Sequence, residues 1–111
     1  MTGLAADPFR LLGPSSAVEE GIVVSYYLGD RKLRISIARV DGHLHAFDDL
    51  CTCAAEPCPL SGGLLHGTTL KCQCHGSQFD ITTGAVVDGP ATAALNLHEV
   101  YEVDGRIRIR A

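Results

Sequence analysis

The sequence has no long hydrophobic run. None of its windows approaches the roughly 18 apolar residues of a membrane-spanning helix, and residues 1–10 lack the basic start and apolar stretch of a secretory signal. No segment shows a convincing helical period, and there are no internal repeats or low-complexity tracts. These absences argue against a membrane anchor, and we expect a cytoplasmic protein.

Basic residues are also scarce. Nine Lys and Arg stand against thirteen Asp and Glu, which gives a formal net charge of −4. That balance argues against nucleic acid as a partner and fits docking on a basic protein surface. A length of 111 residues is that of one domain. We expect a single domain over residues 1–111, with residues 1–13 forming a flexible arm.

The strand patterns predict an all-β fold. Apolar and polar residues alternate, and turn-forming pairs such as Asp41-Gly42 and Asp104-Gly105 separate the alternating segments, as in β-hairpins. In Arg106–Arg110 the alternation is strict, so Ile107 and Ile109 are expected to face the core. The expected strands are Ile22–Leu28, Arg31–Val40, His43–Phe47, Leu97–Val103 and Arg106–Ile109.

The cysteines are bunched between these hairpins. All five fall between positions 51 and 74, in a region rich in Gly and Pro, and His75 follows the last of them. Thiolate and imidazole ligands together suit iron, zinc or copper rather than calcium or magnesium. The positions are Cys51, Cys53, Cys58, Cys72 and Cys74.

The run from Cys72 to Gly84 reads Cys-x-x-His-Gly-Ser-x-Phe-Asp with a Thr-Gly turn after it. It resembles the second ligand loop of Rieske proteins, and the likeness extends over roughly 23–110. The resemblance implies an antiparallel β-barrel or sandwich with a small inserted subdomain, here residues 49–91, that binds a 2Fe–2S cluster.

The first ligand loop departs from the family pattern. The family has Cys-x-His, whereas this chain has Cys51-Thr52-Cys53, and no histidine occurs from position 46 to 65. The resemblance then places Cys51 and Cys72 on the inner iron, and Cys53 and His75 on the outer iron. Cys58 in place of Cys53 remains an alternative third thiolate. A third thiolate makes the centre more negative and therefore lowers its reduction potential. We expect a value at or below the lower edge of the Rieske range, ~−150 mV, and above the ~−400 mV of plant-type ferredoxins.

The resemblance also assigns residues around the cluster. It implies that Ser77 donates a hydrogen bond to a cluster sulfur, that Phe79 stands where high-potential relatives have tyrosine, and that Gly89-Pro90 belongs to a loop shielding the cluster. It further implies a disulfide between Cys58 and Cys74, although a cytosolic setting argues against a stable one.

Three classes of function fit this set of residues. The preferred one is a monomeric, soluble ferredoxin without substrate turnover, which passes one electron from a flavin-dependent ferredoxin reductase to a terminal oxygenase or similar oxidoreductase. The second is a small subunit of a larger enzyme such as a nitrite reductase. The third is a module that senses a cluster or is stabilised by zinc, because three cysteines and one histidine also suit zinc.

Overall fold

The computed structural model describes residues 9–52, 58–74 and 76–110. Within those ranges the chain forms eleven strands and two short 3-10 helices, η1 (Ser15–Ala17) and η2 (Leu60–Gly62). The strands are β1 (Phe9–Pro14), β2 (Val23–Leu28), β3 (Leu33–Val40), β4 (His43–Asp48), β5 (Leu64–His66), β6 (Thr69–Lys71), β7 (Gln78–Asp80), β8 (Val86–Asp88), β9 (Leu97–His98), β10 (Val100–Val103) and β11 (Arg106–Arg110).

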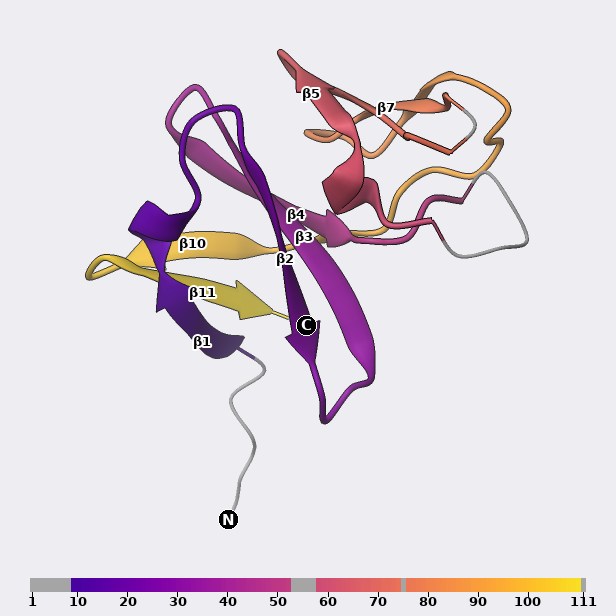
Figure 1. Cartoon of the computed structure of the whole chain (residues 1–111). Coiled ribbons are helices and arrows are strands. Elements are labelled where there is room, and N and C mark those ends of the chain that lie inside the picture. Colours follow the sequence, from indigo (N-terminus) through magenta and orange to yellow (C-terminus); the bar gives the residue numbers. More distant parts are fainter. Residues whose placement is uncertain (1–8, 53–57, 75, 111) are drawn as a thin grey trace.

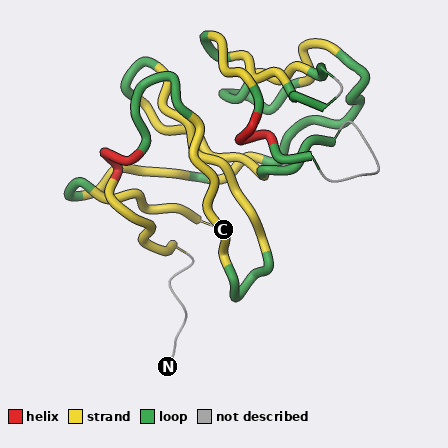
Figure 2. The backbone as a smooth tube through the Cα atoms, in the orientation of Figure 1, coloured by secondary structure: helices red, strands yellow, loops and turns green. Residues whose placement is uncertain are grey.

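The strands make three antiparallel sheets in two lobes (Figures 1 and 2). The sheets β1-β11-β10 and β2-β3-β4-β9 face each other and form the barrel. The sheet β5-β6-β7-β8 belongs to the second lobe, which the chain enters after β4 and leaves before β9. This inserted lobe lies between the end of β4 at Asp48 and the start of β9 at Leu97, where the subdomain was expected. The all-β class with an inserted subdomain is therefore confirmed.

The hairpin turns follow from the turn-forming pairs. Asp41 and Gly42 have φ values of 51° and 78°, and Asp104 and Gly105 have 52° and 74°, as tight two-residue hairpins require. The turn at Gly29-Asp30 is longer than expected. It includes Lys32 at φ 50°, so β3 begins at Leu33 rather than Arg31.

Two expectations for the barrel were wrong. The segment Leu97–Val103 is not one strand, because Glu99 interrupts it: β9 pairs with β4 and β10 with β11, so the chain crosses here between sheets. Residues 9–13 are not part of a flexible arm. They lie in β1, which pairs with β11 because the Leu12 side chain packs on the barrel core and Arg108 lies 4.5 Å above the ring of Phe9. Residues 1–8 lie outside the described residues.

The buried residues form two clusters. One fills the barrel and includes Ile107 and Ile109, both fully buried as the alternation of β11 predicts. The other lies in the inserted lobe and reaches β3 through Ala38. Strand β3 is therefore covered on both faces, and even Ser36 is fully buried.

Arg39 of β3 ties the two barrel sheets together. Its guanidinium forms a bidentate pair with Glu102 of β10, at 2.8 and 3.0 Å, and donates to the carbonyls of Val18 and Ser15. The hydrogen bonds from Arg39 lower the pKa of Glu102 to about 2. Within the described residues, no helix has the length and apolar character needed to span a membrane.

Candidate metal centre

The first ligand loop is held by backbone contacts between its two ends. The Cys51 N–H donates to the Cys58 carbonyl at 2.8 Å, and Leu50 pairs with Pro59 in an isolated bridge. The Thr52 hydroxyl donates to the Ala93 carbonyl at 2.6 Å, which ties the loop to the segment that returns to the barrel. Cys51 is 6 % exposed, so this loop presents a buried sulfur. Cys53 lies outside the described residues.

The second ligand loop is a tight turn between β6 and β7. The Cys72 N–H donates to the Ser77 carbonyl at 2.7 Å, and the Gly76 N–H donates to the Cys72 carbonyl at 3.0 Å. Gly76 has φ 77°, a conformation that glycine adopts without strain. Cys72 is 1 % exposed at the base of this turn. His75, the expected imidazole ligand, lies outside the described residues.

A glycine lets the two loops approach each other. A Cβ atom on Gly63, just after η2, would clash with the carbonyl oxygen of Lys71, the residue before Cys72. The turn that follows the first loop therefore lies directly against the strand that leads into the second.

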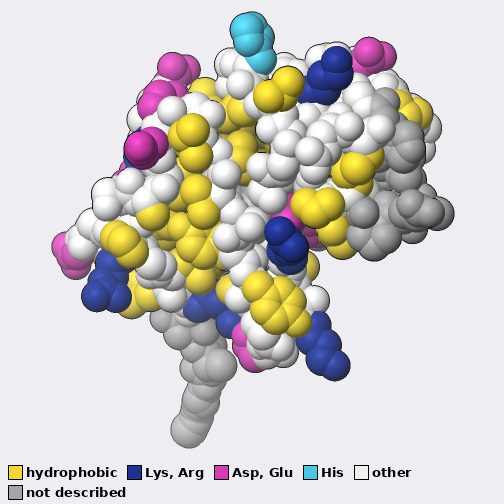
Figure 3. Space-filling model, viewed as in Figure 1, with side chains coloured by type: hydrophobic (Ala, Val, Ile, Leu, Met, Phe, Trp, Pro, Cys, Tyr) yellow, Lys and Arg dark blue, Asp and Glu magenta, His cyan; other side chains and the backbone are white. Residues whose placement is uncertain are grey.

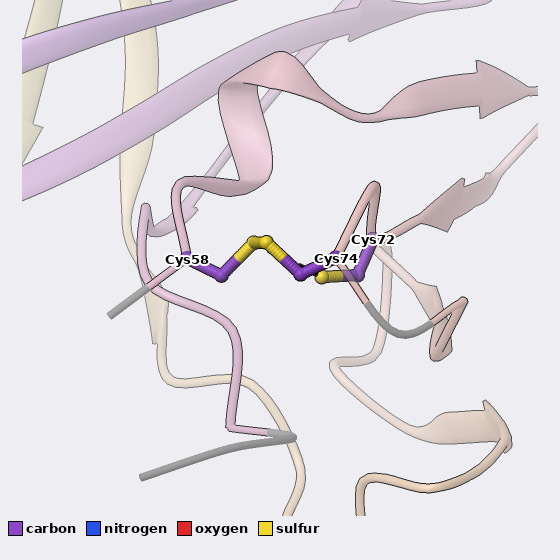
Figure 4. A group of neighbouring side chains, drawn as sticks. All are labelled: Cys58, Cys72 and Cys74. Atoms are coloured by element: carbon purple, nitrogen blue, oxygen red, sulfur yellow. Dashed lines mark hydrogen bonds between the residues drawn. A yellow bond between two sulfur atoms is a disulfide. The ribbon is translucent and has the colours of Figure 1, made fainter. Parts of the chain in front are cut away.

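A disulfide joins the two loops. Cys58, which is buried, is bonded to Cys74, which is exposed, with their Cα atoms 6.4 Å apart (Figure 4). The Cys72 sulfur lies 3.5 Å from the Cys58 sulfur. The sulfur atoms of Cys58, Cys72 and Cys74 all lie within 4.8 Å of one another, and in the part of the chain that the structure describes they are the one such group of potential metal ligands.

The residues expected around the cluster gather beside these loops. Ser77 is fully buried, and its Oγ accepts a hydrogen bond from the Ala91 N–H at 3.0 Å. Accepting that bond leaves the hydroxyl proton to be donated elsewhere. Ala91 follows the cis Gly89-Pro90 peptide, so the expected shielding loop contacts the second ligand loop. Phe79 is fully buried and pairs with Leu70 in the core of the inserted lobe.

The remaining histidines lie away from this group. His98 of β9 is an ordinary strand residue, with its Nε2 at 2.6 Å from a carboxylate oxygen of Asp48. Burial, followed by the charge of His43, lowers the pKa of His45. His66 ends β5 and is exposed. None of the three belongs to the sulfur group described above.

Sequence reasoning did not identify Asp49, which is fully buried two residues before Cys51. The sequence shows it only as the second of two adjacent aspartates, and nothing there indicates that one of them is buried.

Buried soft donors from two loops, beside the segment that contains Ala91, suit an iron–sulfur cluster or a thiophilic ion. The family model described as Rieske [2Fe-2S] domain matches residues 9–102. The ferredoxin component of the naphthalene 1,2-dioxygenase/salicylate 5-hydroxylase systems of a Ralstonia species is 29% identical, over 84% of this chain and 86% of that protein. The ferredoxin CarAc of Metapseudomonas resinovorans is 31% identical, over 68% of each protein.

Solved structures agree in fold. The Sphingomonas yanoikuyae B1 ferredoxin superposes with a TM-score of 0.82 at 28% identity, covering 92% of this chain and 97% of that one. A chain from the complex of reduced oxygenase and oxidized ferredoxin in carbazole 1,9a-dioxygenase gives the same TM-score at 24% identity, over 92% of both chains.

Proposed function

The chain belongs to the Rieske [2Fe-2S] domain family, and from that membership we propose that it carries single electrons from a flavin-dependent ferredoxin reductase to a terminal oxygenase. Its relatives among curated proteins are ferredoxin components of dioxygenase systems, and one solved relative is in complex with an oxygenase. The chain itself turns over no substrate. It acts in the cytoplasm as a monomer.

One observation carries the proposal: the fold brings two cysteine-bearing loops together, with Cys51 and Cys72 buried and with the Ser77 hydroxyl proton available to a sulfur acceptor. These residues fit a 2Fe–2S cluster, which, when bound, takes up and releases one electron. The protein contributes the ligands, the hydrogen bond from Ser77, and the exclusion of water by the segment around Ala91.

We assign Cys51 and Cys72 to the inner iron, and Cys53 and His75 to the outer iron. The disulfide supports this assignment over the alternative, because a Cys58 sulfur bonded to Cys74 has no thiolate to offer a metal. The Cys58 half of the bridge is buried and the Cys74 half is exposed, so the bridge is shielded from cytosolic reductants on one side only.

Three apolar side chains in or beside the inserted lobe are exposed and available to a partner. Leu50, Leu64 and Val87 are exposed on it, by 44%, 74% and 56%, and Figure 3 shows hydrophobic side chains at the surface of this lobe as well as of the barrel. Leu50 directly precedes the ligand Cys51. A partner that covers Leu50 therefore approaches the loop that holds the cluster, which shortens the path for the electron.

The test is a single-turnover electron transfer. The protein is reduced chemically, mixed with an oxidised terminal oxygenase of an aromatic dioxygenase system, and followed by its visible absorbance. Reoxidation that accelerates with oxygenase concentration supports the proposal. Cys51→Ala, which removes a ligand, is the matched control and is expected to give no transfer. A wild-type protein that contains zinc and no visible chromophore would refute the carrier role.

A further inference from the structure

The carboxylate of Asp49 is buried behind the first ligand loop and bound from several sides. One oxygen accepts hydrogen bonds from the hydroxyl of Ser36, itself fully buried, and from the N–H of Ser61 at 2.8 Å. The other oxygen lies 2.6 Å from Nε of Arg34, and within the described residues it accepts no hydrogen bond, so this contact is an ion pair. Asp49 is fully buried, whereas the Arg34 side chain is 47% exposed.

The backbone of Asp49 adds two further connections. Its N–H donates to the Arg34 carbonyl at 3.0 Å, and its carbonyl accepts from the Leu60 N–H. Asp49 therefore joins β3 of the barrel to the η2 turn that follows Cys58, at the point where the chain leaves β4 for Cys51. One residue fixes both ends of the first ligand loop to the barrel.

Asp49 is also close to the metal centre. It lies two positions before Cys51 in the chain, so the Cα atoms of the two residues are at most about 7 Å apart. A charge buried in the protein interior is screened by water less than an exposed charge, so it can act on a group held by the neighbouring Cys51. A neutral side chain of the same shape, such as asparagine, would keep acceptor geometry for Ser36 and Ser61, so the hydrogen bonds alone do not require the charge.

We propose that Asp49 is a positioning residue for Cys51, and that its ion pair with Arg34 sets the fixed charge behind the cluster and thereby its reduction potential. The proposal rests on the function proposed above. The negative member of the pair is buried and the positive member reaches solvent. The carboxylate is consequently the less screened of the two, and its net effect is to oppose the arrival of an electron.

The two partners predict potential shifts of opposite sign. Asp49→Asn removes the buried negative charge and keeps the shape, so the potential is expected to rise. Arg34→Gln leaves the carboxylate without its counter-charge, so the potential is expected to fall. Arg34→Lys keeps the positive charge and should restore most of the wild-type value. A variant that merely loosened the loop would not give this sign reversal.

The experiment measures the midpoint potential of each cluster-loaded variant by spectroelectrochemistry at one pH. The matched control is Asp48→Asn, which removes a negative charge from the residue next to Asp49. The Asp48 side chain is 29% exposed and is paired with His98. Its shift should be smaller than that of Asp49→Asn. Shifts of the same sign for Asp49→Asn and Arg34→Gln, or a control shift as large as that of Asp49→Asn, would overturn the proposal.

Two outcomes need separate readouts. If Asp49→Asn does not fold, the proposal is judged on Arg34→Gln, which is expected to fold because the Arg34 side chain is half-exposed. A lowered midpoint potential in that variant supports the proposal, and an unchanged one overturns it. If the wild type holds no cluster, the proposed function fails, and the positioning role is judged by amide hydrogen exchange. Asp49→Ala should then speed exchange at Ser61, whose N–H the carboxylate accepts. Unchanged exchange there would overturn the positioning role as well.

Discussion

Loss of the Cys58–Cys74 disulfide should destabilise the fold without removing the cluster. The bridge closes a chain segment with a sequence separation of 16. Closing a loop of that length in the unfolded chain is worth about 3 kcal/mol in the entropy model. Reduction of the disulfide in the wild type should therefore lower the free energy of unfolding by about 3 kcal/mol.

The double variant Cys58→Ala/Cys74→Ala should lose slightly more stability than the reduced wild type. Cys58 is 2% exposed, so its truncation also removes a buried sulfur, for roughly 1 kcal/mol beyond the loss of the cross-link. In a domain of this size 1 kcal/mol corresponds to about 4 °C in the melting temperature. The expected decrease is then about 12 °C on reduction and about 16 °C in the variant.

The assay is thermal unfolding followed by circular dichroism, with and without dithiothreitol, together with visible absorbance at each step. The variant should keep its chromophore and should no longer respond to dithiothreitol. Cys53→Ala is the comparison variant, and it should lose the chromophore and keep the disulfide. The reasoning is refuted if the double variant loses the cluster while Cys53→Ala retains it, because the third thiolate would then be Cys58.

Three further outcomes are expected. Gly63→Ala should reduce both stability and cluster content, because its Cβ would displace Lys71 next to the second ligand loop, and this is checked by iron content and melting temperature. The lowered pKa of Glu102, about 2, means that the Arg39 pair stabilises the fold fully above pH 4.5 and that this contribution disappears as the pH falls towards 2. Because Glu102 is 38% exposed, screening limits the effect to about 1 kcal/mol, and Glu102→Gln should flatten the acid limb of the stability curve by that amount. The midpoint potential should lie between ~−400 mV and ~−150 mV, and a value well above zero would contradict a third thiolate ligand.

Local patterns predicted much of the barrel. The alternation of Arg106–Arg110 identified the buried Ile107 and Ile109, and Asp41-Gly42 and Asp104-Gly105 marked two hairpins, because both signals depend only on neighbouring residues. The break at Glu99 depends on which sheet each half of a continuous pattern joins, and that is decided by distant strands.

In the site, too, features carried by local sequence were predicted and features that depend on distant segments were not. The resemblance assigned Cys51, Cys72 and Ser77 to the centre; the structure buries all three and joins Cys72 to Ser77, whereas the close sulfur group contains Cys72 with Cys58 and Cys74. The burial of Asp49 was not foreseeable. It depends on Ser36 and Arg34, more than ten residues earlier, and on a second lobe that covers the outer face of β3.

The ligand set is tested most directly by electron paramagnetic resonance of the reduced protein, with the nitrogen hyperfine couplings resolved. The account predicts a signal of one unpaired electron per chain that carries one strongly coupled imidazole nitrogen, from His75. Two such nitrogens would mean that a second histidine ligates the outer iron in place of Cys53. The absence of the signal from protein made with ample iron would contradict a 2Fe–2S centre altogether.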